Sequence, residues 1–235
     1  MRVEMYWLII IFLFVAVNGF LVWASAYIGS GVYLKSYCRI KCKEKYVALT
    51  FDDSPSQMTG KVLDVLKEHK VKASFFLIGS KIKEDQETVR RIDEEGHIIG
   101  NHSWSHTPGF PTKKYTDVVD EINMTSDVIY ETIGKRPRLF RPPFGVTNPH
   151  IGRAVRRLGM SSIGWNVRSL DTIESRTREE IMSRIISQLK PGSVILMHDR
   201  CKDSDRLLQM LLQYLEENDY KVVTIEEMFN LKIYD

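Results

Sequence analysis

The sequence lacks a strong net charge, because 33 Lys and Arg residues are nearly balanced by 30 Asp and Glu residues, and the formal net charge is +3. So small a basic excess gives no reason to expect a nucleic acid as partner. Cysteine is scarce as well. The three residues Cys38, Cys42 and Cys201 fit one disulfide plus a free thiol as well as three free thiols. Neither feature points to a protein partner.

Charged residues are missing altogether from Met5 to Leu34, a stretch of thirty residues. Such a run is long enough to cross the hydrocarbon core of a bilayer, whereas a buried core helix would normally carry a polar stripe. Ala24, Ser25 and Ala26, which follow an apolar run headed by Arg2, also fit the cleavage pattern of a signal peptide. We therefore expect residues 1–34 to be a signal anchor or a signal peptide.

No internal repeat, low-complexity stretch or second domain boundary interrupts the remainder of the chain. Residues 35–45 are predicted to be a basic linker and residues 46–235 a single globular domain. The linker carries five basic residues, and the positive-inside rule taken alone would place the domain in the cytoplasm. These residues are Lys35, Arg39, Lys41, Lys43 and Lys45.

From Tyr46 onward, short β-branched or aromatic runs alternate with longer amphipathic patterns, which is typical of βα units and a parallel sheet. The expected strands are Tyr46–Phe51, Lys72–Ile78, His97–Asn101, Arg138–Arg141, Ser161–Val167, Ser193–His198 and Lys221–Ile225. The expected helices are Gly60–Lys70, Glu87–Glu95, Thr116–Ile133, Ile151–Leu158, Arg178–Leu189 and Asp205–Glu217.

Unusual polar residues fall at the carboxyl ends of five of these seven strands. An open sheet gathers its ligands at one switch point, whereas a closed barrel brings the ends of many strands around one mouth. The pattern therefore favours an α/β fold with a distorted parallel (β/α) barrel. The residues concerned are Asp52, Asp53, His102, Arg141, Asp171 and His198.

His102 and His106 are separated by three residues at the end of a predicted strand. Two imidazoles and one carboxylate form a three-ligand site with a position left open, which is typical of a catalytic metal. Zinc is the first expectation from two nitrogens and one oxygen, and cobalt, nickel or manganese would also be accepted. Unrelated histidines in a loop are the simpler reading of this pair taken alone.

Asp52 and Asp53 follow a buried strand directly, and two ionised side chains there are costly unless each has a partner. A helix cap at Asp53 or Ser54 explains one carboxylate but not both. One aspartate can bind a metal while the other accepts a proton from the attacking water.

Arg141, Phe144 and His198 complete the candidate chemistry. Arg141 offers a planar fork of donors to a carboxylate, and the turn after Pro142 and Pro143 exposes the Phe144 N–H as a candidate oxyanion donor. His198 is a candidate general acid at the end of an apolar strand. A surface arginine and a core histidine are the alternative readings.

In this order, the segments TFDDSP, HSWSH, RPPFG, WNVRSLD and LMHD resemble the polysaccharide deacetylase family, also called carbohydrate esterase family four or the nodulation-protein deacetylase homology domain. The resemblance spans roughly residues 46–229. It implies a distorted (β/α)7 barrel and a metal-dependent hydrolase that removes N-acetyl groups from N-acetylglucosamine-containing glycans such as peptidoglycan or chitin-like oligomers.

The resemblance also implies roles for individual residues. Asp52 would be the general base, oriented by Arg141, and Asp53, His102 and His106 would hold the metal. The Phe144 N–H would stabilise the oxyanion, with Pro143 and Trp165 on the substrate-binding side. His198 would protonate the departing amine and Asp171 would orient it.

Four positions depart from the family pattern. Ser54 stands where glycine is usual and Phe144 where tyrosine is commoner. Arg168 stands where aspartate is frequent, and Thr172 where tryptophan often follows Asp171. The last two put the surroundings of the acid and the sugar-binding wall in question.

Two further expectations concern place and activity. The family's substrates lie outside the cell, so we expect an extracytoplasmic domain, against the indication of the basic residues 35–45. The alternative functions are a metal-dependent amidohydrolase of the same fold acting on a non-sugar amide and a non-catalytic, membrane-tethered glycan-binding module.

Overall fold

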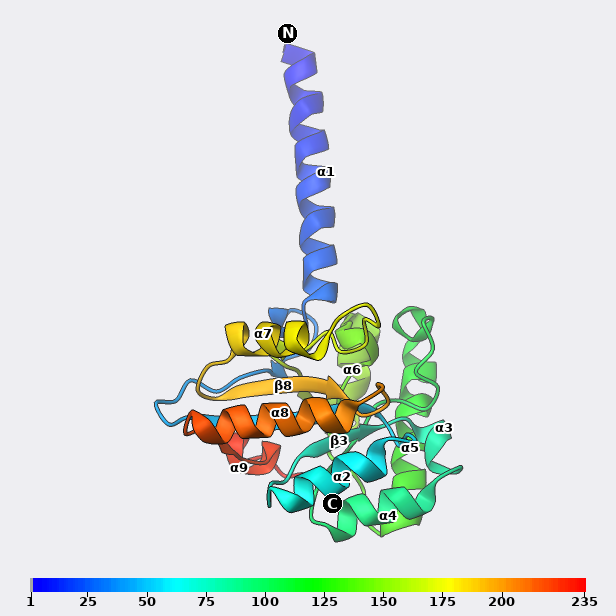
Figure 1. Cartoon of the computed structure of the whole chain (residues 1–235). Coiled ribbons are helices and arrows are strands. Elements are labelled where there is room, and N and C mark those ends of the chain that lie inside the picture. Colours follow the sequence, from blue (N-terminus) through cyan, green and yellow to red (C-terminus); the bar gives the residue numbers. More distant parts are fainter. Residues whose placement is uncertain (1) are drawn as a thin grey trace.

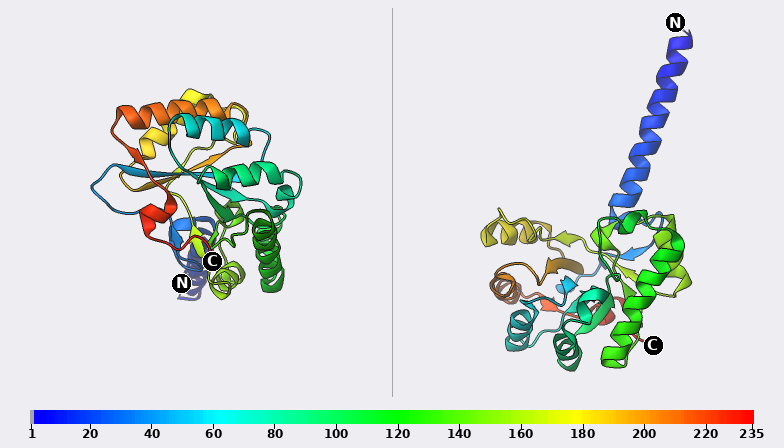
Figure 2. Two further views of the ribbon diagram at one scale, coloured as in Figure 1. Left: turned by 90° about the horizontal axis from the view of Figure 1, so that it is seen from below. Right: turned by 90° about the vertical axis from the view of Figure 1, so that its right-hand side faces the viewer.

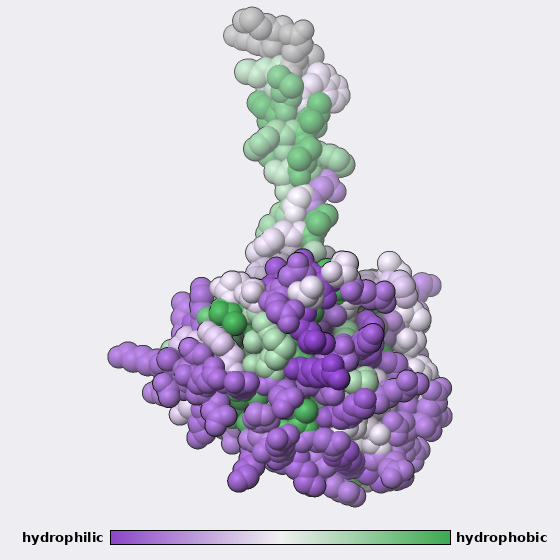
Figure 3. Space-filling view, in the orientation of Figure 1, coloured by the Kyte–Doolittle hydropathy of each residue, from purple (hydrophilic) through white to green (hydrophobic). Residues whose placement is uncertain are grey.

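The uncharged N-terminal stretch forms one long helix that projects from the rest of the molecule (Figure 1). The computed structural model describes residues 2–235, and α1 spans Arg2–Ala26. Its apolar part, Met5–Ala26, is 22 residues long and exposes its large apolar side chains (Figure 3). At about 1.5 Å per residue, such a helix reaches across a hydrocarbon core of about 30 Å. α1 is therefore a candidate membrane span.

The domain after α1 is built on one nine-stranded sheet with the strand order β1-β6-β5-β4-β3-β2-β8-β7, and β9 pairs with β2. Every strand pair is parallel. The strands are β1 Ser36–Tyr37, β2 Tyr46–Ser54, β3 Ser74–Leu77, β4 Ile98–Asn101, β5 Leu139–Phe140, β6 Ser161–Ile163, β7 Val167–Arg168, β8 Ser193–His198 and β9 Lys221–Val222.

Seven of the strands, β2 to β8, curve into the distorted parallel barrel that the sequence predicts. Within residues 2–235, β6 and β7 do not pair with each other, so the barrel is open between them. β1 pairs with β6, Arg39 forms an antiparallel bridge with Ser193, and the Ile40 N–H donates to the Gly192 carbonyl. Residues 36–40 thus cross the open side, and part of the stretch expected as a linker belongs to the sheet.

The predicted bounds of two strands are wrong. The range 161–167 is not one strand, because the Gly164 N–H donates to Tyr37 of β1 while the Asn166 N–H donates to Val194 of β8. The backbone changes partners there, and the barrel opens at that point. The range 221–225 contains only the two-residue β9, which lies beside the first residues of β2, and helix α9 begins at Ile225.

The six predicted helices all form, within two residues of the expected bounds, and they surround the outside of the sheet (Figure 2). They are α2 Thr59–Glu68, α4 Gln86–Glu94, α5 Tyr115–Ile133, α6 Pro149–Arg157, α7 Arg178–Gln188 and α8 Ser204–Glu217. The shorter elements are α3 Gly79–Ile82, α9 Ile225–Phe229 and the 3-10 helices η1 Ile28–Ser30, η2 Phe110–Thr112 and η3 Pro143–Gly145.

Alternation along β2 sorts its side chains between two sides of the barrel wall. Val47, Leu49 and Phe51 pack in one buried cluster with the leucines of α2 and α8. Ala48 packs inside the barrel with one residue from each of five other strands, namely Phe76, Ile98, Leu139, Ile163 and Val194. Thr50 and Asp52 have the same parity as Ala48, so they also face the interior, near the mouth.

Candidate active site

Asp52 lies at the carboxyl end of β2 and is 3% exposed. Arg141, which follows β5 and is fully buried, donates from Nη1 to Asp52 Oδ1 at 2.6 Å and to Thr50 Oγ1 at 2.8 Å. Its Nε and Nη2 donate to the carbonyls of Ile163 and Gly164. Because its partners lie on β2, on β6 and on the β6–β7 connection, the arginine is fixed in place and holds the carboxylate in one orientation.

Asp53, His102 and His106 have ligand atoms that all lie within 4.8 Å of one another. Asp53 Oδ1 is 3.7 Å from His102 Nε2 and 3.5 Å from His106 Nε2. Among residues 2–235 this buried oxygen has no hydrogen-bond partner. An orphaned oxygen facing two imidazole nitrogens fits a divalent ion, because each of the three atoms can donate a lone pair to it. The three residues form a group able to hold a metal.

The imidazole of His102 is prepared for that role by its other nitrogen. Nδ1 lies 2.8 Å from the Arg141 carbonyl, which can only accept a hydrogen bond. In the neutral ring Nδ1 therefore carries the proton, which leaves the lone pair of Nε2 directed at Asp53.

The electrostatics favour the metal-binding protonation states. Burial alone would raise the pKa of Asp53, but His102, His106 and the Arg200 guanidinium lower it to about 2. Burial, and then the neighbouring His102, lower the pKa of His106 to about 4. Near neutral pH the trio is thus a carboxylate with at least one neutral imidazole, as a metal site requires.

The loop that carries the histidines is held by two buried polar residues. Asn101 accepts from the Ser103 N–H and donates to Ile122 and Ser126 of α5. Glu121 accepts from the backbone of Trp104 and Ser105. These bonds fix a strained stretch: the φ angles of Ser103 and His106 are +67° and +45°, while that of Asp53 beside them is +69°. Strain of this kind gathers at functional sites.

His198 and Asp171 stand on the other side of Asp52. His198 ends β8 and is the register partner of Asp52 on β2. Asp171 Oδ1 lies 2.8 Å from His198 Nδ1, and Oδ2 accepts from the His198 backbone N–H at 2.7 Å. Burial lowers the pKa of His198, but the hydrogen bond and charge of Asp171 raise it more, so the pKa lies above its ordinary value. The ring is held as a proton donor facing the site.

The RPPFG segment forms the wall beside the histidines. Phe144 has a φ of +60°, its ring is 4.7 Å from that of His106, and it is 47% exposed. Gly145 follows with a φ of +70°, and a Cβ there would meet the Trp165 ring at 2.5 Å. Only glycine allows this close approach. Phe144, Pro143 and Trp165 are thereby brought to one side of the mouth.

The family profile described as polysaccharide deacetylase matches residues 39–163, more than half of the chain. The sequence is also 33% identical over 190 residues to the peptidoglycan-N-acetylmuramic acid deacetylase PdaA of Bacillus subtilis, a match that covers 79% of this chain and 72% of PdaA. The chain belongs to the polysaccharide deacetylase family. Longer relatives exist: the chain spans 43% of the peptidoglycan-N-acetylglucosamine deacetylase PgdA of Listeria monocytogenes.

Solved structures agree with this membership. The Bc1960 peptidoglycan N-acetylglucosamine deacetylase has a TM-score of 0.77 at 30% identity, over 90% of this chain and 96% of that one. A CE4 family pseudoenzyme from Bacillus anthracis has a TM-score of 0.75 at 28% identity, over 81% and 67%. Because one relative is a pseudoenzyme, membership of the deacetylase family does not by itself establish turnover, and the completeness of the site matters.

Two residues of this family member were missed by the sequence reasoning. Arg200 donates from Nε to Asp53 Oδ2 at 2.6 Å, on the oxygen that faces away from the histidines. Asp199 is fully buried and accepts from the hydroxyls of Ser54 and Thr59. Asp199 had a signal, because it lies in the LMHD segment, but the pairing of Arg200 with β2 depends on a contact across 147 residues.

The departures from the family pattern separate into two groups. Ser54 is buried, and its hydroxyl donates a hydrogen bond to Asp199 Oδ2 at 2.7 Å, so its side chain has a structural partner. Arg168 and Thr172 are exposed, on β7 and just after Asp171. Thr172 lines a cavity of about 730 Å³ together with Asp171 and Arg200. The acid itself is intact, and what differs is the wall beside it.

Proposed function

We propose that this chain is a metal-dependent deacetylase that hydrolyses N-acetyl groups on N-acetylglucosamine-containing glycans of the cell wall and releases acetate. The observation that carries the proposal is the juxtaposition of Asp52, held by Arg141, with the Asp53 trio on one side and the His198–Asp171 pair on the other. PdaA, PgdA and Bc1960 are peptidoglycan deacetylases, which supports the substrate class.

Asp53, His102 and His106 would hold the divalent ion, and zinc suits two nitrogens and one oxygen best, with cobalt, nickel or manganese as alternatives. Such an ion supplies Lewis acidity for an acyl carbonyl and for water. Asp52 would take the proton of the attacking water, because its Oδ2 is 3.6 Å from His102 Nε2 while Oδ1 is occupied by Arg141.

His198 would complete the reaction from the opposite side. Attack on the acetamide carbonyl gives a tetrahedral oxyanion, for which the Phe144 N–H is the proposed donor. His198 then gives its proton to the departing nitrogen, which leaves the free amino sugar, and Asp171 keeps the ring oriented. Pro143 and Trp165 would form the wall against which the sugar lies.

We also propose that α1 is a retained membrane anchor and that the domain lies on the extracytoplasmic side. The substrates of the named relatives are cell-wall polymers, which supports this side. The basic residues 35–45 argue weakly for the cytoplasm, but a folded domain is exported largely regardless of such charges.

Acetate release tests the proposal. The full chain in detergent, loaded with zinc, is incubated with the N-acetylglucosamine tetramer and with peptidoglycan. We expect acetate from these glycans, loss of it with a chelator, and recovery on adding zinc. Release only from small cyclic amides would favour the non-sugar amidohydrolase instead. Glycan binding without acetate at any metal loading, unchanged in Asp52→Asn, would favour a binding module like the pseudoenzyme relative.

A further inference from the structure

The last turn of α1 is bonded to the same segment that carries Phe144. The Thr147 N–H donates to the Ser25 carbonyl at 2.9 Å, and the Thr147 hydroxyl donates to the Ala24 carbonyl at 3.3 Å. Ala24 and Thr147 are both fully buried. The end of the candidate membrane span is therefore part of the folded domain, at the wall of the candidate active site.

The residues after α1 continue this attachment. Ile28 is 3% exposed and packs over Gly164, whose carbonyl accepts from Arg141. Leu34 is buried in a cluster with Phe110 and Phe140. These contacts leave no free linker between helix and domain. The distance between the domain and the C-terminal end of α1 is therefore fixed.

Aromatic residues mark where α1 leaves the bilayer. Trp23 lies with its ring 5.8 Å from that of Phe20 and 6.1 Å from that of Tyr27. All three side chains are about half exposed. Trp and Tyr are enriched at headgroup level, where an apolar ring meets a polar edge. The interface therefore lies at about residues 23–27, and Thr147 bonds directly to this stretch.

The site entrance follows from this position. Phe144 precedes Thr147 by three residues, and a chain spans at most about 3.5 Å per residue, so Phe144 lies within about 10 Å of Thr147. The mouth of the barrel thus opens close to the headgroup layer.

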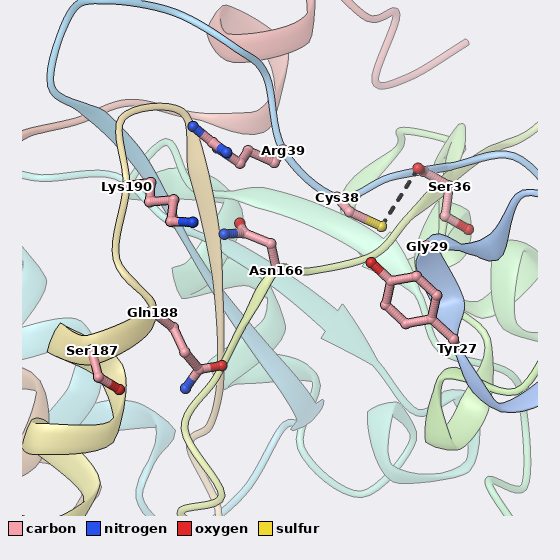
Figure 4. Close-up of a pocket in the computed structure, with 9 residues that line it drawn as sticks. All are labelled: Tyr27, Gly29, Ser36, Cys38, Arg39, Asn166, Ser187, Gln188 and Lys190. Atoms are coloured by element: carbon pink, nitrogen blue, oxygen red, sulfur yellow. Dashed lines mark hydrogen bonds between the residues drawn. The ribbon is translucent and has the colours of Figure 1, made fainter. Parts of the chain in front are cut away.

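The domain also carries cations beside Tyr27, at the amino end of β8 rather than at the mouth. A cavity of about 560 Å³ lies beside Tyr27, at the open side of the barrel, and Arg39 and Lys190 line it (Figure 4). None of its nine lining residues is acidic. The positive charge of this cavity is complementary to the negative charge of lipid phosphates.

We propose that this chain deacetylates glycans that are themselves attached to the membrane, as the sugar part of an amphiphile whose lipid lies in the same bilayer. The proposal rests on the proposed function and on α1 as a span. A site fixed at headgroup height meets sugars close to their lipid, whereas a distant polymer would need a longer or flexible tether. Tethering both partners to one surface raises their effective concentration to about the millimolar range.

The test uses the full chain in vesicles and one oligosaccharide in two forms. The N-acetylglucosamine tetramer is supplied free or coupled to a phospholipid in the same vesicles, at equal and micromolar total concentration. We expect acetate release from the coupled form to be at least about tenfold faster, and this preference to disappear in detergent.

A height variant sharpens the test. Seven polar, helix-forming residues inserted between Trp23 and Ala24 lift the domain by about 10 Å and nearly preserve its rotation, without touching the Ala24 and Ser25 contacts. The same seven residues inserted before Met5 serve as the control. The lifted variant should lose most of the preference while its rate on the free tetramer stays within about twofold, and the control should keep both.

The two possible failures are distinguishable. If the free and coupled tetramers are deacetylated equally fast in vesicles, or if the lifted variant keeps the full preference, the inference is wrong and the proposed function stands. If neither form yields acetate while zinc is bound, the proposed function itself fails.

Discussion

The two sides of the candidate site are built to different degrees of rigidity. The base-and-metal side rests on β2, β4 and the end of β5, and its Arg141 is fully buried with bonds to four groups. The acid side rests on β8 and on β7, a two-residue strand at the edge of the sheet, and one carboxylate orients its histidine. The family departures at Arg168 and Thr172 fall on this second side, whereas those at Ser54 and Phe144 lie on the first.

The difference indicates where the chain can vary. On the base-and-metal side Arg141 alone bonds to four groups across strands, so a substitution there disturbs several partners at once. On the acid side, exposed residues surround a single bonded pair, and they can change without breaking the pair. The predictions below test this contrast.

The largest effect is expected from His102→Gln, which removes a nitrogen ligand and the bond to the Arg141 carbonyl. Acetate release should fall to the detection limit, and bound zinc, measured by elemental analysis, should fall from one per chain to near none. Full zinc content in this variant would contradict the assignment of the trio. His150→Gln, an exposed histidine on α6, is the control.

Asp52→Asn should lower kcat by about 10²–10⁴-fold, because the amide can still accept from Arg141 but cannot take a proton from water. Zinc content should change little, but the free energy of unfolding should fall, because the fully buried Arg141 loses its counter-charge. A variant that retains nearly full activity would assign the base to another group.

Arg141→Met tests how far the base side depends on its clamp. Removing one partner of a buried ion pair costs about 3–5 kcal/mol, and the free energy of unfolding measured in urea should fall by that order. Arg138→Met, which removes an ion pair to Asp235 that is about one-third exposed, should cost no more than about 1 kcal/mol. Equal losses in the two variants would show that burial of the clamp is unimportant.

Asp171→Asn acts on the acid side. Asp171 raises the pKa of His198, and an acid must be protonated to act, so the raised pKa extends activity toward higher pH. Removing the carboxylate should move the alkaline limb of the kcat profile to lower pH. It should also lower kcat by about 10- to 100-fold, since a hydrogen bond to a charged group contributes about 1.5–3 kcal/mol. An unmoved limb would exclude His198 as the acid.

Thr172→Trp should have the smallest effect. Thr172 is exposed beside Asp171 and lines a cavity, so an indole there adds apolar surface for a sugar without touching the catalytic pair. We expect KM for the tetramer to fall a few-fold with kcat unchanged. A large fall in kcat would mean that a substitution in this wall disturbs the catalytic pair, as substitutions on the metal side are expected to do.

Much of the base-and-metal side could be predicted from the sequence because its residues follow strand ends within short segments. Two adjacent aspartates and a His-x-x-x-His pair are local patterns, and parallel strands bring their carboxyl ends to one mouth. The (β/α) barrel could be predicted from the alternation of strand and helix patterns along the sequence. In the structure the predicted residues meet around Asp52.

The features that escaped prediction depend on contacts far apart in the sequence. The break at Gly164 exists because β1 and β8 compete for the backbone of residues 164–166, and apolar composition cannot reveal that competition. The ion pair of Arg200 with Asp53 and the bond of Thr147 to α1 are equally non-local. Local sequence patterns do not reveal which residues far apart in the chain become hydrogen-bond partners after folding.

The crossing of the barrel opening by residues 36–40 also sets an order of assembly. The Ser36 hydroxyl meets that of Ser162 across 126 residues, so the first strand of the sheet finds its place only after five more strands, β2 to β6, have been made. Contacts of such high contact order form late, because the loop must first be closed. The segment that follows α1 therefore takes its place in the sheet late in folding.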